Sequence, residues 1–377
     1  MGAIDADPFD VFTGIYYREY PDLYVADSMP LNFVRTQRNL DPRVRAFGVG
    51  ASTSYDMFIV GDTEKFSWVA LVDANGSQRK YIRVTPGTGY SDGVFKDTSS
   101  PTEFLGSIIF WDHGAWTVRL LNGVEYTIRG CSETSKPGQC AVTEIRNPNG
   151  KKVTIQRDFR GNIHRITSPH QHYISVTTDT DGKITRAEDD AGHWVSYEYD
   201  PAGWLKKATT WRGETDEFKY DTNFNMIWVG EKDRKTAAGK YRFTVMNRFD
   251  EKNRFKWQKV GFGNSVQIFS ATYKEDAEGK IRQTNVHSND GMSNYFFNAA
   301  GYATREDFTP LNGAKWSLEY TRHPETNATT DTWLSCRASR IHVSASISAK
   351  LEAMGEGHQL VVSKECESLE ARSAQQP

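Results

Sequence analysis

The chain has 377 residues, of which 46 are basic and 48 acidic, which gives a net charge of −2. Near-neutrality provides no electrostatic reason to expect nucleic acid or an anionic membrane as a partner. The length allows two or three domains, or one domain and a repeat array, and no apolar run approaches the roughly 18 residues that a membrane span needs.

The N-terminal residues 1–7 are acidic and lack an apolar stretch, so we expect no secretory signal. We therefore expect synthesis in the cytoplasm, and export by a dedicated secretion system stays open. Residues 7–145 are then predicted to form a β-rich leader domain. Apolar and polar residues alternate, as in half-buried strands, at 55–60, 66–72, 81–84 and 116–121.

A repeat with a period of 21 residues follows a predicted turn at residues 147–150. Each period contains two strand-like stretches and two tight turns, and the first turn reads Asp-x-x-Gly. The first-turn residues are Asp158, Asp179, Asp200 and Asp221 with Gly161, Gly182 and Gly203, and the second-turn residues are Gln171, Gly192 and Gly213. We interpret the aspartates as acceptors of backbone N–H bonds in their turns.

The repeat continues in weaker form, with longer loops, to about residue 330. Its later turn residues are Asp250, Asn253, Asp276, Gly279, Asn298 and Gly301. We count about eight units between residues 153 and 330. A two-strand unit cannot bury its apolar face alone, so the units are expected to stack edge to edge. The predicted fold is all-β: a β-rich leader followed by an open, curved sheet of stacked hairpins.

Residues 331–377 leave the repeat and are predicted to form a short C-terminal extension. We expect strands at 340–345 and 358–363, a short helix at 349–354 and a disordered end. The cysteines are too few for a disulfide framework. Two pairs, Cys131 with Cys140 and Cys336 with Cys366, would bridge in an oxidising compartment, but reduced thiols are favoured and the question stays open.

The repeat resembles the YD repeat of the Rhs family, whose units read roughly Tyr-x-Tyr-Asp-x-x-Gly-Arg-Leu. Here Tyr197, Tyr199, Asp200, Gly203 and Leu205 follow that pattern. The leader is similar to the domain that precedes the repeats in Rhs proteins, and the segments that carry this resemblance are residues 7–14, 22–23 and 30–36. The resemblance extends from residue 7 to about 330.

The resemblance implies a structural role without enzymatic activity. In the family, such strands wind into a hollow shell around a C-terminal toxin, in a bacterial contact-dependent or secreted polymorphic-toxin system. Eight units are fewer than a full shell needs, so the chain resembles the opening arc of one. The implied partners are other shell segments or a toxin cargo, and not nucleic acid.

The residues themselves predict no catalytic site, no metal and no cofactor. His164, His170 and His172 form a histidine cluster, but no third ligand stands at useful spacing. The acidic run Glu188 to Asp190 precedes a second turn, where carboxylates cap turns and stay solvated.

The alternative function is a carbohydrate- or partner-binding surface on the repeat sheet, with a cell-surface glycan as ligand. The candidate sugar-stacking residues are Trp194, Trp204 and Trp211, within a group that also includes Trp228 and Trp257. An exposed aromatic strip would favour binding, whereas a packed one would favour a scaffold.

Overall fold

The computed structural model describes residues 9–74, 76–98, 102–129, 141–232, 241, 243–262, 265–336 and 339–343, together with Val362 and Cys366. Among these residues, helical geometry occurs only at Val362 and Cys366, and all other regular structure is antiparallel strand. The all-β prediction is therefore confirmed. No helix in the described part of the chain is long and apolar enough to cross a membrane.

The chain divides into two compact units. The larger contains Tyr17–Phe243, and the smaller combines Met1–Tyr16 with Thr244–Pro377. This division falls inside the predicted repeat array and differs from the predicted division into leader, array and extension.

In the larger unit, two small sheets come first. Strands β1 (Tyr17–Val25), β2 (Leu31–Arg38) and β5 (Ala51–Thr53) form one, and β3 (Val44–Arg45) pairs with β4 (Gly48–Val49). Alternate residues of β2 are buried, so this sheet has one face in the core.

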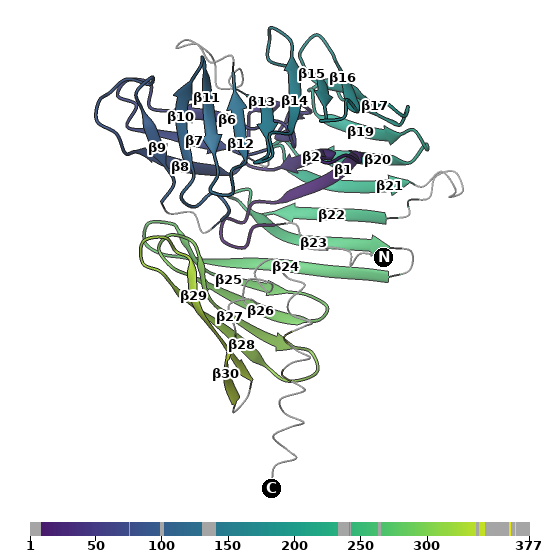
Figure 1. Cartoon of the computed structure of the whole chain (residues 1–377). Coiled ribbons are helices and arrows are strands. Elements are labelled where there is room, and N and C mark those ends of the chain that lie inside the picture. The colour runs from purple at the N-terminus through teal and green to yellow at the C-terminus, as the bar shows by residue number, and fades with distance from the viewer. Residues whose placement is uncertain are drawn as a thin grey trace. The chain divides into compact units, whose positions relative to one another are not determined.

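A closed ring of strands follows in chain order (Figure 1). Its strands are β6 (Phe58–Gly61), β7 (Trp68–Val72), β8 (Gln78–Arg83), β9 (Val94–Lys96), β10 (Ile108–Asp112), β11 (Ala115–Arg119), β12 (Glu125–Ile128) and β13 (Val142–Arg146). The ring closes because Phe58 bridges to Ala141 and the Val142 N–H donates to the Met57 carbonyl at 2.8 Å. Phe58, Val72 and Ala141 pack together at this closure. The first strand of the sheet is therefore not an open edge.

The repeat strands continue from β13 without a break. They are β14 (Lys152–Arg157), β15 (Ile163–Thr167), β16 (Tyr173–Thr178), β17 (Ile184–Asp189), β18 (Trp194–Tyr199), β19 (Leu205–Thr210), β20 (Thr215–Tyr220) and β21 (Met226–Lys232). Glu144 of β13 pairs with Thr154 of β14. The predicted boundary between leader and array is thus a hairpin turn within one sheet, because the hydrogen-bonded ladder runs through it.

The leader sheet covers one face of these repeat strands. Tyr20 of β1 meets Phe218 of β20 edge to face, with ring centroids 5.5 Å apart, and Phe47 meets Tyr197 of β18 at 4.8 Å. Ile184 donates its N–H to the Ala46 carbonyl at 2.8 Å. The apolar residues of alternate repeat positions are therefore buried against the leader, and the opposite face carries the polar positions.

In the smaller unit, the strands again pair in chain order. They are β23 (Phe255–Phe262), β24 (Ser265–Glu275), β25 (Ile281–His287), β26 (Gly291–Phe297), β27 (Ala303–Pro310), β28 (Trp316–Arg322), β29 (Thr329–Cys336) and β30 (Ser339–Val343), after β22 (Phe243–Phe249) at the boundary between the units. Phe9 stacks on Phe255 with ring centroids 4.4 Å apart, so Phe9 packs on this sheet.

The C-terminal extension is partly described. The strand predicted at 340–345 exists as β30, so the sheet continues past residue 331. Val362 is helical, which contradicts a strand there, and the rest of 358–363, the helix predicted at 349–354 and the disordered end lie outside the described residues. Cys336 and Cys366 form a disulfide in a core with Trp316, whereas Cys131 and Cys140 lie outside the described residues.

Candidate functional site

The repeat aspartates organise their turns by local hydrogen bonds. The Asp200 N–H donates to the Trp204 carbonyl at 2.9 Å, and the Gly203 N–H donates to the Asp200 carbonyl at 3.0 Å. Asp200 Oδ1 accepts the N–H groups of Ala202 and Trp204, both at 2.9 Å. Gly203 has a φ of +84°, which a glycine adopts without strain. This is a three-residue hairpin loop with a bulge.

Seven first turns of the repeat share this arrangement. Besides Asp200, the turns begin at Asp158, Asp179, Asp221, Asp250, Asp276 and Asn298. The fourth turn residue keeps a positive φ even where it is not glycine, as at Phe224 (+66°) and Asn253 (+59°). These side chains are engaged in turn geometry, which is a structural use.

The second turn of the first repeat unit depends on the leader. Its first residue is Ser168, where the next unit has Asp189. Asp27, in the loop between β1 and β2, accepts Ser168 Oγ at 2.5 Å, the His170 N–H at 3.0 Å and His170 Nδ1 at 2.5 Å. Burial alone would raise the pKa of Asp27, but these hydrogen bonds hold it well below its usual range.

Serine, histidine and aspartate meet here, but not as a nucleophilic triad. Activation of a serine requires a hydrogen bond from its hydroxyl to the imidazole base. Ser168 and His170 both bond to Asp27 instead, and Ser168 is buried. Because the lowered pKa of Asp27 also makes it a poor base, this group can hold a turn but has no geometry for attack on a substrate.

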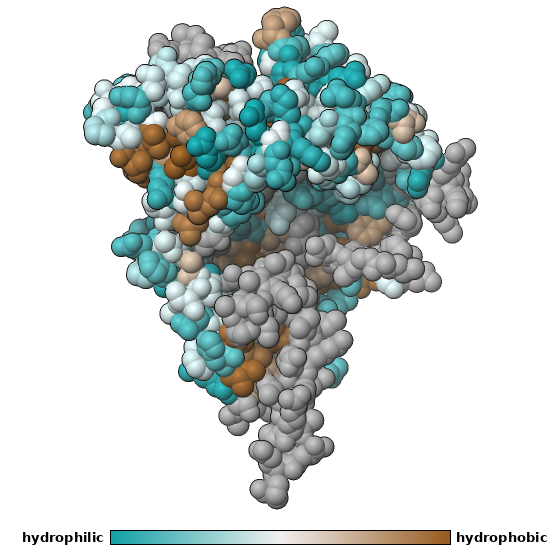
Figure 2. All heavy atoms as spheres, in the orientation of Figure 1, coloured by the Kyte–Doolittle hydropathy of each residue, from teal (hydrophilic) through white to brown (hydrophobic). Residues whose placement is uncertain are grey.

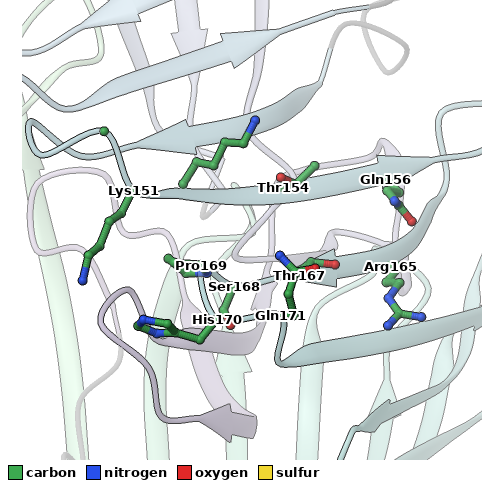
Figure 3. A pocket seen from close by; sticks show the side chains of 11 residues that line it. Lys151, Thr154, Gln156, Arg165, Thr167, Ser168, Pro169, His170 and Gln171 are labelled. Carbon is green, nitrogen blue, oxygen red and sulfur yellow. The ribbon is translucent and has the colours of Figure 1, made fainter.

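An open pocket of about 650 Å³ lies beside this turn (Figure 3). Thr154 and Gln156 project from β14, and Arg165 and Thr167 project from the neighbouring β15 (Figure 3). The remaining lining residues are Gly150, Lys151, Lys152, Ser168, Pro169, His170 and Gln171. The space-filling view shows mainly hydrophilic residues over the region of β13–β17 (Figure 2). The pocket can therefore recognise a ligand by charge and hydrogen bonds.

A buried ion cluster joins the leader to the other face of the repeat sheet. Arg35 of β2 is fully buried and binds Asp22 at 3.0 Å and Asp216 of β20 at 3.7 Å. Its guanidinium carbon lies 4.1 Å from the centre of the Tyr20 ring. Burial raises the pKa of Tyr197, so its hydroxyl stays protonated and donates to Asp22 at 2.7 Å.

Asp216 is the titratable member of this cluster. Burial raises its pKa to about 7, although the Arg35 charge opposes that change. Asp27, Arg35 and Asp216 were missed by sequence reasoning. The one available signal was Arg35 itself, which occupies an apolar position in the alternation of Leu31 and Phe33.

The predicted histidine and acidic clusters do not converge. His170 bonds to Asp27, His172 bonds to Asp190 at 2.6 Å, and His164 is exposed. Of the acidic run, Glu188 pairs with Arg186, and Asp189 accepts turn N–H groups. Among the described residues, no group of three or more histidine, cysteine, aspartate or glutamate side chains could hold a metal ion.

The candidate sugar-stacking tryptophans do not form one strip. Trp194 and Trp211 are neighbours at one end of the strands, since the Trp211 N–H donates to the Trp194 carbonyl at 2.8 Å. Trp204 lies at the other end and packs edge-on against Tyr220 and Phe224. The Arg186 guanidinium lies 4.5 Å from the centre of the Trp194 ring. The rings of Trp194 and Trp204 thus contact protein partners, whereas the Trp211 ring is exposed.

The fold and these sites define an all-β protein in which a leader sheet packs on a run of repeated antiparallel hairpins. Residues 6–81 match the family model described as "Domain of unknown function (DUF6531)". No curated protein matches the chain.

Among solved structures, the chain is similar to the Photorhabdus luminescens Tc holotoxin pore, with 11% identity, a TM-score of 0.27, and 85% of this chain and 21% of that chain covered. TcdB2–TccC3 without its hypervariable C-terminal region is 11% identical, with a TM-score of 0.28. The match covers 85% of this chain and 22% of that chain. A porin-like protein from Bacteroides uniformis is 11% identical, with a TM-score of 0.27. The match covers 61% of this chain and 95% of that chain. The chain spans about a fifth of the length of the first of these structures.

Proposed function

We propose that this chain is a non-enzymatic scaffold, a segment of an Rhs-type toxin shell whose hairpins are YD repeats. One observation carries the proposal: the leader is bonded to a repeat sheet whose periodic aspartates are committed to turns. On the leader, Asp27 accepts a hydrogen bond from the Ser168 hydroxyl and Arg35 pairs with Asp216 of the sheet. Such an arrangement holds a long sheet in shape and leaves its reactive groups occupied.

The sequence supports the same proposal independently. The 21-residue period resembles the YD repeat, and the family match at residues 6–81 covers part of the leader that resembles the Rhs N-terminal domain. In this proposal, further shell segments or a toxin cargo are the partners.

Light scattering and electron microscopy of the full chain test this function. We expect association that increases with protein concentration, and curved particles with a hollow interior when further repeats are supplied on the same polypeptide. A chain that stays monomeric at all concentrations, and forms compact particles without an interior when further repeats are added, would contradict a shell role.

A further inference from the structure

We propose that a pocket between the leader sheet and the closed ring of strands binds a small aliphatic diamine, whose two ammonium groups are held by Glu19 and Glu103. This site goes beyond the scaffold role and does not depend on it, because every residue of its lining belongs to the leader and none to the repeat strands. The pocket has a volume of about 320 Å³, which is enough for a small ligand.

The alternation of side chains along β2 gives the leader sheet two working faces. Arg35 is on the face that packs on the repeat strands. Successive side chains of a strand lie on opposite faces, so Thr36 is on the other face. Thr36 lines the pocket, together with Glu19 of β1, its partner in the strand register. The ring contributes Arg79 of β8 and Tyr126 of β12.

The charge of the lining favours a cation. Glu19, Asp73 and Glu103 are its acidic residues, and Arg79 is the only basic one among the described residues of the lining. Arg79 is paired with Asp73, and its guanidinium carbon lies 4.2 Å from the centre of the Phe104 ring. Glu19 and Glu103 have no salt-bridge partner in the described part of the chain. Two negative charges are therefore left for a ligand that carries two positive ones.

A buried hydroxyl in the same wall is a second and independent indication of a ligand. Thr36 is 2% exposed, and its hydroxyl makes no hydrogen bond with another described residue. The nearby Ser54 hydroxyl, by contrast, donates to the Asn32 carbonyl at 2.6 Å. A buried hydroxyl without a partner costs free energy. An ammonium group has only donors to offer, so it is a suitable partner for the oxygen of Thr36.

The remaining lining fits the hydrocarbon part of such a ligand. Val34, Met57 and Phe104 offer apolar surface to methylene groups. The Tyr126 ring stacks on Phe104 with centroids 6.5 Å apart. Burial raises the pKa of Tyr126 to about 12, so its hydroxyl stays protonated and can accept a hydrogen bond from an ammonium group.

A metal ion is a poorer match for the pocket than an organic cation. In the part of the chain that the structure describes, no three acidic, histidine or cysteine side chains are grouped so that they could hold a metal. Calcium takes six to eight oxygen ligands, and magnesium requires a regular octahedron. Two separate carboxylates beside aromatic and aliphatic side chains suit a chain with an ammonium group at each end.

Isothermal titration calorimetry with the full chain tests the site. The probes are the diamines from 1,3-diaminopropane to 1,6-diaminohexane, with n-butylamine as the singly charged probe and 1,4-butanediol as the uncharged one. We expect the best diamine to bind about tenfold or more tightly than butylamine, because it makes one more charge-assisted contact. Its binding should weaken at higher salt, and butanediol should not bind.

Variants of the lining should separate the contributions. Glu19→Gln and Glu103→Gln should each weaken binding of the best diamine about tenfold, to the level of butylamine. Thr36→Val removes the hydroxyl and keeps the shape of the side chain, so it should weaken binding several-fold. Glu64→Gln is the matched control, because Glu64 is an exposed carboxylate of the ring, in the turn between β6 and β7, that does not line the pocket.

Thermal melts of each variant verify that the fold persists. Equal binding of butylamine and the diamines, no heat at millimolar diamine, or full binding by a folded Glu103→Gln protein would overturn the site. Calcium or magnesium that binds as tightly as the best diamine would overturn the assignment to an amine. Nα-acetyl-lysine amide that binds as tightly would overturn the assignment to a diamine and indicate a lysine side chain of a protein partner.

Discussion

Asp27 provides Ser168 with the carboxylate that the repeat provides to itself one unit later. Asp27 Oδ2 accepts the His170 N–H at 3.0 Å, and Asp189 Oδ1 accepts the corresponding Ala191 N–H at 3.0 Å. The same turn is therefore completed once by the leader and once by its own first residue. This bond connects the loop between β1 and β2 to the turn between β15 and β16 of the repeat sheet.

Removal of this carboxylate should loosen the leader from the sheet. Asp27→Asn is expected to lower the melting temperature by a few degrees, because an amide is a weaker acceptor for the Ser168 hydroxyl and the His170 N–H. Differential scanning calorimetry measures the change. The double variant Asp27→Asn with Ser168→Asp should recover much of the loss, because position 168 then has the aspartate of the next unit. Failure of this rescue, with the fold intact, would contradict the equivalence of the two turns.

The turn glycine Gly203 should be sensitive to backbone strain. A Cβ at this position would meet no atom within 4 Å, so only its φ of +84° opposes a side chain. Gly203→Val should lower the free energy of unfolding by about 1–3 kcal/mol. Gly203→Asn is the control, because Asn253 occupies the same turn position at +59°. Urea denaturation that finds the two variants equally stable would refute the strain argument.

Asp216 should make stability depend on pH. Its pKa is raised to about 7, so between its ordinary value of 3.8 and 7 the folded state binds more protons than the unfolded state. The free energy of unfolding should therefore fall as pH rises through this window. The charges of Arg35, Glu231, Asp22 and Arg18 act on this carboxyl group.

The expected decrease is about 1–3 kcal/mol, below the full value of the pKa change, because 28% of the Asp216 side chain is exposed and water offsets part of the burial. Urea denaturation at a series of pH values measures it. Asp216→Asn should flatten this part of the profile. An unchanged profile in that variant would show that another group is responsible.

Loss of the buried Arg35 should lower the free energy of unfolding more than loss of any surface cation. Arg35→Met leaves Asp22 and Asp216 without their counter-charge, and should lower the free energy of unfolding by about 3–5 kcal/mol. Arg186→Gln removes a partly exposed pair and should change it by less than about 1 kcal/mol. Denaturant titrations of both variants provide the comparison, and similar losses would contradict the central role of the cluster.

The disulfide between Cys336 and Cys366 should stabilise the smaller unit. It closes a loop with a sequence separation of 30 residues, and its removal should lower stability by about 3–4 kcal/mol. The double variant Cys336→Ala with Cys366→Ala, melted beside the parent protein with and without reductant, tests this. A parent that is insensitive to reductant after unfolding and refolding in its presence would argue against the bridge.

The local parts of this fold were predictable from the sequence. The Asp200 turn is made by hydrogen bonds between residues at most four positions apart. A short segment of sequence therefore contains all the residues that define the turn. Strand alternation is local in the same sense, which is why the all-β class and the strands on both sides of Asp200 were predicted. The junction predicted near residue 150 is a hairpin turn in the structure, and a hairpin turn and a linker have similar composition.

What determined the sites was contact between residues far apart in the chain. Ser168 and Asp27 are separated by 141 residues, and the sequence around each of them contains no motif that predicts their hydrogen bond. The closure of β6 onto the start of β13 and the burial of Arg35 against Asp216 are of the same kind. A period of 21 residues specifies where the chain turns, since turns are local hydrogen-bond patterns. Only the packing of the leader on the sheet decides which polar residues lose their water and gain partners.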